Sequence, residues 1–295
     1  MKKLSFFCLL LIGLICSCNP EEDSYSPGRS ITAEELKAAS NVSVYQENGK
    51  NINYVHFSTT APATVMWTNG NITSLLPTGD MQMLVTGKQT ITVVAFNPDG
   101  NEVSADFNVN VDEISPKHPV SKYWQYLTGG SSKTWVWDNS ISDKCWGNCG
   151  YSSVGSQGLL ASGSEWWGVS SSGIAEQIAS YKYGSADGGD ASMTFTLKGS
   201  VLTKSSGGKG TFSFDEKTSN IGGYSDIGPT MGHLSTGGSG ILFPVRINAG
   251  STTSTFDISY IDDNQLILCY PNHPSSESGS ASWKEGTYWR FKAKK

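Results

Sequence analysis

The sequence predicts an all-β protein, and three observations support this prediction. Short segments of alternating polar and apolar residues recur along most of the chain, separated by turns rich in Gly, Asn and Asp. Charged residues make up only 16% of the chain, whereas glycine occurs 33 times, which is typical of turn-rich β-proteins. Segment 114–119 holds two prolines and separates two strand-rich modules. We expect an immunoglobulin-like sandwich followed by a jelly-roll-like β-sandwich, with a lipocalin-like, up-and-down barrel as second choice for the latter.

Residues 1–17 have the pattern of a secretory signal peptide. Two lysines precede an apolar run from Leu4 to Ile15, and small Ser17 stands before Cys18. The run is shorter than the ~20 residues that a membrane-spanning helix needs. This ending resembles the lipobox of bacterial lipoproteins, which implies that Cys18 is acylated and begins the mature chain.

Segment 18–41 is predicted to be a lipid-anchored tether that ends in a short helix. Thr32 and Glu35 have the spacing of a capping box. The acidic run after Cys18 is similar to the signal that sends lipoproteins of the Bacteroidetes group to the outer face of the outer membrane. A solvated acidic linker facing the periplasm is the alternative.

The charge balance limits the partners. The chain carries 21 basic and 26 acidic residues, and loss of a signal peptide that contains two lysines makes it more negative still. A negative chain is a poor partner for nucleic acid or an anionic bilayer. We therefore expect that the protein does not bind nucleic acid. We also expect that it contacts the membrane through the lipid anchor alone.

Segment 42–113 carries the strands of the expected sandwich. The candidates are 42–45, 55–57, 64–67, 81–85, 90–96 and 103–111, with turns at Asn48-Gly49, Asn69-Gly70 and 97–100. The Trp67 strand before a Gly turn, the later Gly87 and the hairpin at 97–100 resemble a PKD module. Such modules usually serve as spacers, which is the role that the resemblance implies here.

Segment 120–295 holds eight of the nine tryptophans. Its expected strands are 134–137, 192–197, 211–214, 241–245, 255–261, 265–270 and 287–291, and a short helix is expected within 173–181. Trp135, Trp137 and Trp289 alternate within strands and are expected in the core. Trp146, Trp166, Trp167 and Trp283 lie where no strand pattern buries them, and we take these four as the candidate glycan-binding residues.

The cysteines and acidic turns give further candidate sites. Cys145 and Cys149 are a candidate disulfide, with a zinc site as the alternative. Cys269 lies in an apolar strand and is expected to be a buried small residue. Asp187 and Asp190 flank two glycines and could bind calcium, although a polar turn is the simpler interpretation. Otherwise we expect no cofactor.

The second module also resembles a known domain. Leu127-Thr128-Gly129-Gly130, the following Lys133-Thr134-Trp135-Val136, the Trp166-Trp167 pair and the ending Tyr288-Trp289-Arg290-Phe291 are similar to a domain found after PKD modules in surface glycan-binding lipoproteins of gut Bacteroidetes. The resemblance implies capture of polysaccharide beside an outer-membrane glycan-uptake complex. The insertion around Cys145 departs from that pattern, which leaves the shape of the site open.

Two other functions remain as alternatives. A glycoside hydrolase generally needs two carboxylates on either side of the scissile bond, and no local motif supplies them, although Glu165 and Asp257 are carboxylates that could act from different strands. An adhesin would use the same exposed aromatics to bind a protein. We expect non-catalytic polysaccharide binding, with the hydrolase second and the adhesin third.

Overall fold

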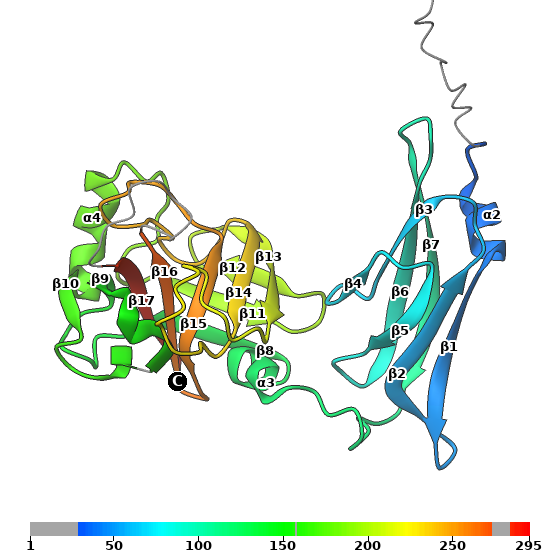
Figure 1. Ribbon diagram of the computed structural model, residues 1–295, viewed down its shortest axis with the longest axis horizontal. Coiled ribbons are helices and arrows are strands. Elements are labelled where there is room, and N and C mark those ends of the chain that lie inside the picture. The colour runs from blue at the N-terminus through cyan, green and yellow to red at the C-terminus, as the bar shows by residue number, and fades with distance from the viewer. Residues whose placement is uncertain (1–28, 157, 273–283) are drawn as a thin grey trace, which may run out of the picture.

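The protein folds as two β modules joined by segment 114–119 (Figure 1). The computed structural model describes residues 29–156, 158–272 and 284–295. Cys18 and Trp283 lie outside these residues. In the described part of the chain the helices are short, none being long and apolar enough to cross a bilayer. The expected all-β class is confirmed.

The first module opens with helix α2 (Ala33–Ala38). The predicted capping box is present, because the backbone N–H of Glu35 donates to Thr32 Oγ1 at 3.2 Å and the N–H of Thr32 donates to Glu35 Oε2 at 2.9 Å. Leu36, which is fully buried, packs into the core of the sandwich that follows.

Two antiparallel sheets form the sandwich that the strand pattern predicts. One sheet has the order β1-β2-β5 and the other β4-β3-β6-β7. The strands are β1 (Ser40–Glu47), β2 (Lys50–Thr59), β3 (Thr64–Thr68), β4 (Thr73–Ser74), β5 (Thr78–Gln82), β6 (Gly87–Phe96) and β7 (Glu102–Val111). Asn48 and Gly49 both have positive φ, as a two-residue hairpin turn requires. Trp67 and Phe57 pack 5.0 Å apart in the core between the sheets.

The linker is held against the sandwich. The backbone N–H of Ser115 donates to Asn53 Oδ1 at 2.8 Å, and Asn53 Nδ2 donates to the carbonyl of His118 at 2.9 Å. The His118 ring stacks on Tyr54 with centroids 4.2 Å apart. The buried Asn53 amide and the stacked His118 ring therefore fix this segment in one conformation between the two modules.

The second module is a closed barrel of eight antiparallel strands. After helix α3 (Lys122–Thr128), the closed ring runs β8-β11-β12-β13-β14-β15-β16-β17 and returns to β8. These strands are β8 (Ser132–Trp137), β11 (Ser192–Thr196), β12 (Val201–Lys204), β13 (Lys209–Asp215), β14 (His233–Gly238), β15 (Thr255–Ile261), β16 (Gln265–Pro271) and β17 (Glu285–Ala293).

The expected jelly-roll-like sandwich is therefore wrong for this module. From β11 to β17 each strand pairs with the next one along the chain, and Phe291 of β17 pairs with Trp137 of β8 to close the ring. A jelly roll would require crossovers between two sheets. The second choice, an up-and-down barrel, describes the observed topology.

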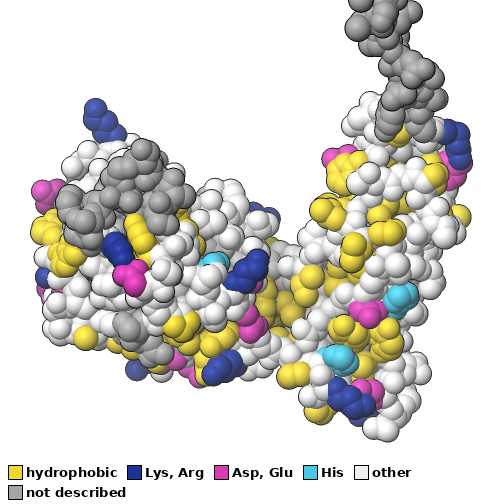
Figure 2. All heavy atoms as spheres, in the orientation of Figure 1, with side chains coloured by type: hydrophobic (Ala, Val, Ile, Leu, Met, Phe, Trp, Pro, Cys, Tyr) yellow, Lys and Arg dark blue, Asp and Glu magenta, His cyan; other side chains and the backbone are white. Residues whose placement is uncertain are grey.

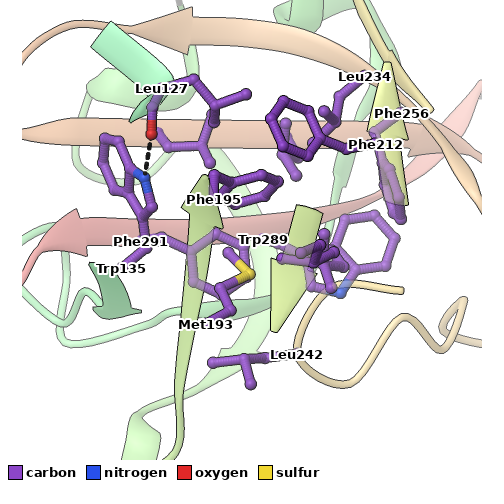
Figure 3. Close-up of a cluster of buried hydrophobic side chains, with 14 of the residues drawn as sticks. Leu127, Trp135, Met193, Phe195, Phe212, Leu234, Leu242, Phe256, Trp289 and Phe291 are labelled. Carbon is purple, nitrogen blue, oxygen red and sulfur yellow. Dashed lines mark hydrogen bonds between the residues drawn. The ribbon is translucent and has the colours of Figure 1, made fainter. Parts of the chain in front are cut away.

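Large side chains fill the barrel interior (Figure 3). Trp135, Trp137 and Trp289 are buried as expected, and Trp135 Nε1 donates to the carbonyl of Leu127 at 2.9 Å. The predicted strand 241–245 is instead irregular, with Phe243 at a φ of 41°. Its side chains are nevertheless buried in the same core, which explains why an apolar run was mistaken for a strand.

The sheet extends beyond the barrel through two further strands. β9 (Trp146–Gly150) pairs with the first half of β17, and β10 (Glu165–Val169) pairs with β9 at the edge of the sheet. Three 3-10 helices, η1 (Tyr151–Ser156), η2 (Gly158–Leu160) and η3 (Ser171–Gly173), and helix α4 (Ile174–Ser180) complete this region. Tyr151 and Leu159 cover outward-facing Ile267 and Tyr288, so β16 and β17 are buried on both faces.

Candidate functional site

The four candidate tryptophans have different environments. Trp166 and Trp167 are 51% and 44% exposed, and they are the large exposed aromatics among the described residues of the barrel module. Trp146 is fully buried, and its Nε1 donates to the carbonyl of Val245 at 3.2 Å. Trp146 is therefore a core residue, and its assignment as a glycan-binding residue is wrong. Trp283 lies outside the described residues.

A β-bulge places Trp166 and Trp167 on the same face of the sheet. Glu165 pairs with Cys149 and Trp167 pairs with Asn148, so β10 advances two residues while β9 advances one. Trp167 shares the face of Asn148, its direct partner. The Trp166 ring lies over Gly150 on that face, where a Cβ would be 3.3 Å from its Cζ2 atom. An unbroken strand would have directed the two indoles to opposite faces.

A buried ion pair anchors β10 from the opposite face. Arg290 Nη2 donates to Glu165 Oε2 at 3.2 Å, and both side chains are almost fully buried. The guanidinium also donates to the carbonyls of Ile141, Lys144 and Leu159. Burial alone would raise the pKa of Glu165, but hydrogen bonds and the Arg290 charge together hold that pKa below its usual value.

Beside the two indoles lies a pair of asparagines held by one carboxylate. Asn148 Nδ2 and Asn248 Nδ2 both donate to Glu285 Oε1, at 2.5 and 2.8 Å. Because the amide nitrogens face Glu285, the side-chain oxygens of the asparagines are left as acceptors. We call the surface formed by Trp166, Trp167, Asn148 and Asn248 the tryptophan face.

Aromatic contacts connect the two sides of the tryptophan face. Buried Trp146 packs edge-on against Trp167 at 6.2 Å and against Tyr181 at 5.9 Å. The Tyr181 hydroxyl accepts a hydrogen bond from the backbone N–H of Asn248 at 3.3 Å. The core thus supports both Trp167 and the loop that carries Asn248.

Among the described residues, the buried polar atoms without a hydrogen-bond partner include Asn148 Oδ1 on the tryptophan face, and Asn272 Nδ2 and Arg246 Nε on the far side of β17. Arg246 Nη2 donates to the carbonyl of Asn272 at 2.7 Å, and its guanidinium lies 4.9 Å from the centre of the Tyr270 ring. Buried polar groups are normally paired. Asn148 Oδ1 is thus the one of these three atoms that belongs to the tryptophan face, where a bound water would complete its hydrogen bond.

The candidate disulfide is absent. Cys145, Cys149 and Cys269 are free and buried. Cys145 directly precedes β9 and Cys149 lies within it, so four steps along an extended chain separate their α-carbons by about 13 Å, well beyond the ~7 Å limit for a disulfide. Burial raises the pKa of the Cys145 thiol, as expected for a structural cysteine.

Of the two candidate calcium ligands, Asp187 is buried and already has partners, whereas Asp190 is exposed. Asp187 Oδ2 accepts hydrogen bonds from Lys204 Nζ at 2.7 Å and from the backbone N–H of Phe243 at 3.0 Å, while Oδ1 accepts from Ser206 at 2.7 Å. Lys204 thus neutralises the charge that would attract calcium. Within residues 29–156, 158–272 and 284–295, no group of three or more metal-ligating side chains occurs.

The two carboxylates considered for hydrolysis lie away from the tryptophan face. Glu165 is paired with Arg290 on the opposite face, as described above. Asp257 is fully buried, accepts a hydrogen bond from the Tyr151 hydroxyl and lies 3.2 Å from His233 Nε2. Both carboxylates therefore fix structure, and neither contacts the exposed indoles.

Comparisons with known proteins give only weak similarities. No protein-family model and no curated protein sequence matches the chain. The PKD1 domain of the Vibrio cholerae metalloprotease PrtV aligns with a TM-score of 0.21 and 16% identity, over 25% of this chain and 94% of that domain. The PKD1 domain of Vibrio anguillarum Epp gives 0.21 and 13%, over 26% and 93%. A carbohydrate-binding module of the β-sandwich superfamily gives 0.20 and 9%, over 86% and 91%.

Sequence reasoning missed the polar half of the tryptophan face. Asn148, Asn248 and Glu285 come from β9, from the loop after the irregular segment 241–245, and from the start of β17. No short motif joins them, because the sheet register alone brings them together. The one available signal is Gly147-Asn148 inside the Cys145–Cys149 segment, which has no alternating pattern that would predict the strand β9.

Proposed function

We propose that the protein binds polysaccharide at the tryptophan face without cleaving it. The observation that carries this proposal is the bulge that turns Trp166 and Trp167 toward one face, beside the exposed Asn248, whose amide nitrogen is held by Glu285 and whose oxygen is left as an acceptor. Sugar rings stack their C–H patches on flat aromatic faces, and their hydroxyls donate to amide oxygens. Exposed paired indoles are costly to solubility unless they serve a contact.

The first test is affinity electrophoresis of residues 19–295 through gels that contain plant, fungal or host polysaccharides. Retardation by one glycan class, with no sugar released on prolonged incubation, is the expected result. Release of sugar would support the hydrolase alternative. Retardation by none of the polysaccharides would overturn the glycan proposal and favour a protein partner.

The site is tested by the double variant Trp166→Ala/Trp167→Ala. Loss of a binding hot spot costs about 2 kcal/mol or more, roughly thirtyfold in affinity, and the fold should remain intact because both side chains are exposed. Tyr45→Ala is the matched control, since Tyr45 is a similarly exposed aromatic on the first module. Equal affinity of the double variant and the control would rule out the tryptophan face.

We further propose that Cys18 carries the lipid anchor and that the sandwich is a spacer at the outer face of the outer membrane, beside a glycan-uptake complex. The support is the sequence pattern around Cys18. Cys18→Ala should abolish labelling by a radioactive fatty acid. Externally added protease should degrade the wild-type protein on intact cells, and protection of the protein would instead indicate the periplasmic face.

A further inference from the structure

A pocket lies between the two modules, away from the tryptophan face. It has a volume of about 670 Å³ and is lined by residues of the sandwich, the linker, α3 and the end of β13. Figure 2 shows hydrophobic side chains in the hollow between the two modules. Ligand pockets commonly have volumes of about 300–1,000 Å³ and occur preferentially at domain interfaces. We call this the junction pocket.

Aromatic side chains form one wall of the junction pocket. Tyr123 and Phe214 are half-buried, with ring centroids 5.7 Å apart, and Phe214 also packs against Trp124 at 5.9 Å. Phe212 lies two residues earlier on the same face of β13 and is buried inside the barrel. Phe214 therefore sits at the barrel rim, where α3 covers only part of its ring.

The other wall carries two amides whose nitrogens already have partners. Asn71 Nδ2 donates to the carbonyl of Leu197 at 2.5 Å and to Ser200 Oγ at 2.6 Å. Gln82 Nε2 donates to the carbonyls of His118 and Pro119 at 2.8 and 3.1 Å. Because these bonds fix both amides, each offers the pocket an acceptor oxygen.

The charges at the pocket favour a neutral ligand. Glu216 lines the pocket, is exposed and adds another acceptor, while Lys122 lies 5.5 Å from the Tyr123 ring centre. Lys122 and Glu216 both line the pocket, so one positive and one negative charge offset each other beside three acceptor groups and an aromatic shelf. Such a site suits a neutral molecule that donates hydroxyl protons and stacks a C–H face, because its lining carries no net charge to attract an anionic or a cationic chain.

We propose that the junction pocket is a second saccharide site, specific for a neutral oligosaccharide stacked on Tyr123 and Phe214. For the class of its ligand this rests on the proposed function, but it shares no residue with the tryptophan face. Two sites on one chain hold a long polysaccharide more tightly than either alone, because the second contact forms at high effective concentration. Asn71 also bonds the sandwich to the barrel module and Gln82 bonds it to the linker, so an occupied pocket stabilises the junction.

The test is calorimetric titration with a neutral oligosaccharide prepared from the polysaccharide that retards the wild-type protein. We expect two sites per chain in the wild type, one in Tyr123→Ala/Phe214→Ala, one in Trp166→Ala/Trp167→Ala, and none in the combined variant. Glu216→Lys is a second junction variant that leaves the barrel core untouched, and it should weaken one site only. Tyr45→Ala should retain both.

The outcomes separate the two proposals. One site that vanishes with the tryptophan pair, and is unaffected by the junction variants, overturns the junction pocket and leaves the proposed function standing. One site that vanishes only with the junction variants overturns the tryptophan face and supports the junction pocket. Stronger binding of an acidic oligosaccharide at the junction would overturn the assigned ligand class.

Discussion

Arg290 shows how a single buried charge can organise part of the barrel module. Its guanidinium donates to three loop carbonyls and to Glu165, and so connects β17 with β10 and with the segment that precedes β10. Burying such a pair gives little net stability compared with apolar residues, but removal of one partner leaves an uncompensated charge. The pair is therefore important for the position of the tryptophan face.

We predict that Arg290→Met lowers the free energy of unfolding by about 3–5 kcal/mol, measured by urea denaturation. The double variant Glu165→Gln/Arg290→Met should recover part of this loss, because it removes the stranded charge. Lys50→Met is the control, since the Lys50–Glu113 pair is exposed and screened by solvent and should change the stability little. A loss as small as that of the control would contradict a structural role for Arg290.

His233 gives the barrel a pH-dependent contribution to stability. The hydrogen bond to Asp257 raises the pKa of His233 above 6.5, and burial only partly opposes it. A raised folded pKa means that the stabilisation is complete below the unfolded value and is lost as pH rises through the folded value. The negative charge of Asp215 also raises the pKa of His233.

We therefore predict that the stability difference between the wild type and His233→Asn shrinks as pH rises from about 6.5 through the folded pKa of His233. Thermal unfolding at a series of pH values measures this difference. A difference that stays constant or grows with pH would show that the His233–Asp257 contact does not raise the pKa.

At the scale of elements, the close packing of β10 against β9 and β17 requires glycine at two positions. A Cβ at Gly147 of β9 would lie 2.1 Å from the carbonyl oxygen of Trp167, and one at Gly168 would lie 2.2 Å from the Tyr288 hydroxyl. Real Cβ atoms cannot approach so closely, so both strands need glycine at these positions. Gly147 and Gly168 thus determine how close the two indoles of the tryptophan face lie to its asparagines.

We predict that Gly147→Ala displaces β10 and weakens polysaccharide retention about as much as loss of both exposed tryptophans, although every ligand-contacting side chain is retained. Affinity electrophoresis measures retention, and circular dichroism checks that the barrel remains folded. Gly184→Ala is the matched control, because a Cβ there meets nothing within 4 Å. Unchanged retention in Gly147→Ala would mean that β10 can shift without cost to binding.

Local patterns predicted local structure well. Alternation identified Trp135, Trp137 and Trp289 as core residues, and the Thr32–Glu35 spacing identified the first helix. The same approach misassigned 241–245, because an apolar run has no period that distinguishes a strand from a buried irregular segment. It also gave no sign that Arg290 is buried, since a charged residue between apolar ones normally indicates a solvated face.

At the scale of the whole molecule, long-range pairing decided what the sequence could not show. Barrel closure depends on Trp137 pairing with Phe291, and the site depends on Asn148 and Glu285 meeting across β9 and β17. Neither relation has a local pattern, so a barrel and a sandwich remained alternatives. The exposed tryptophan pair could be predicted, whereas the polar groups beside it could not.

The pairing of β17 with both β8 and β9 also has a consequence for how the chain folds. The sandwich is built mainly from hairpins between neighbouring strands, such as β1–β2 and β6–β7, which form early. β8 must wait for β17 to emerge, and such non-local pairing folds slowly. Until then, the tryptophan-bearing strand β8 has an open edge at risk of aggregation. The vulnerable stage in the synthesis of this protein is therefore the interval in which a finished sandwich carries an unclosed barrel.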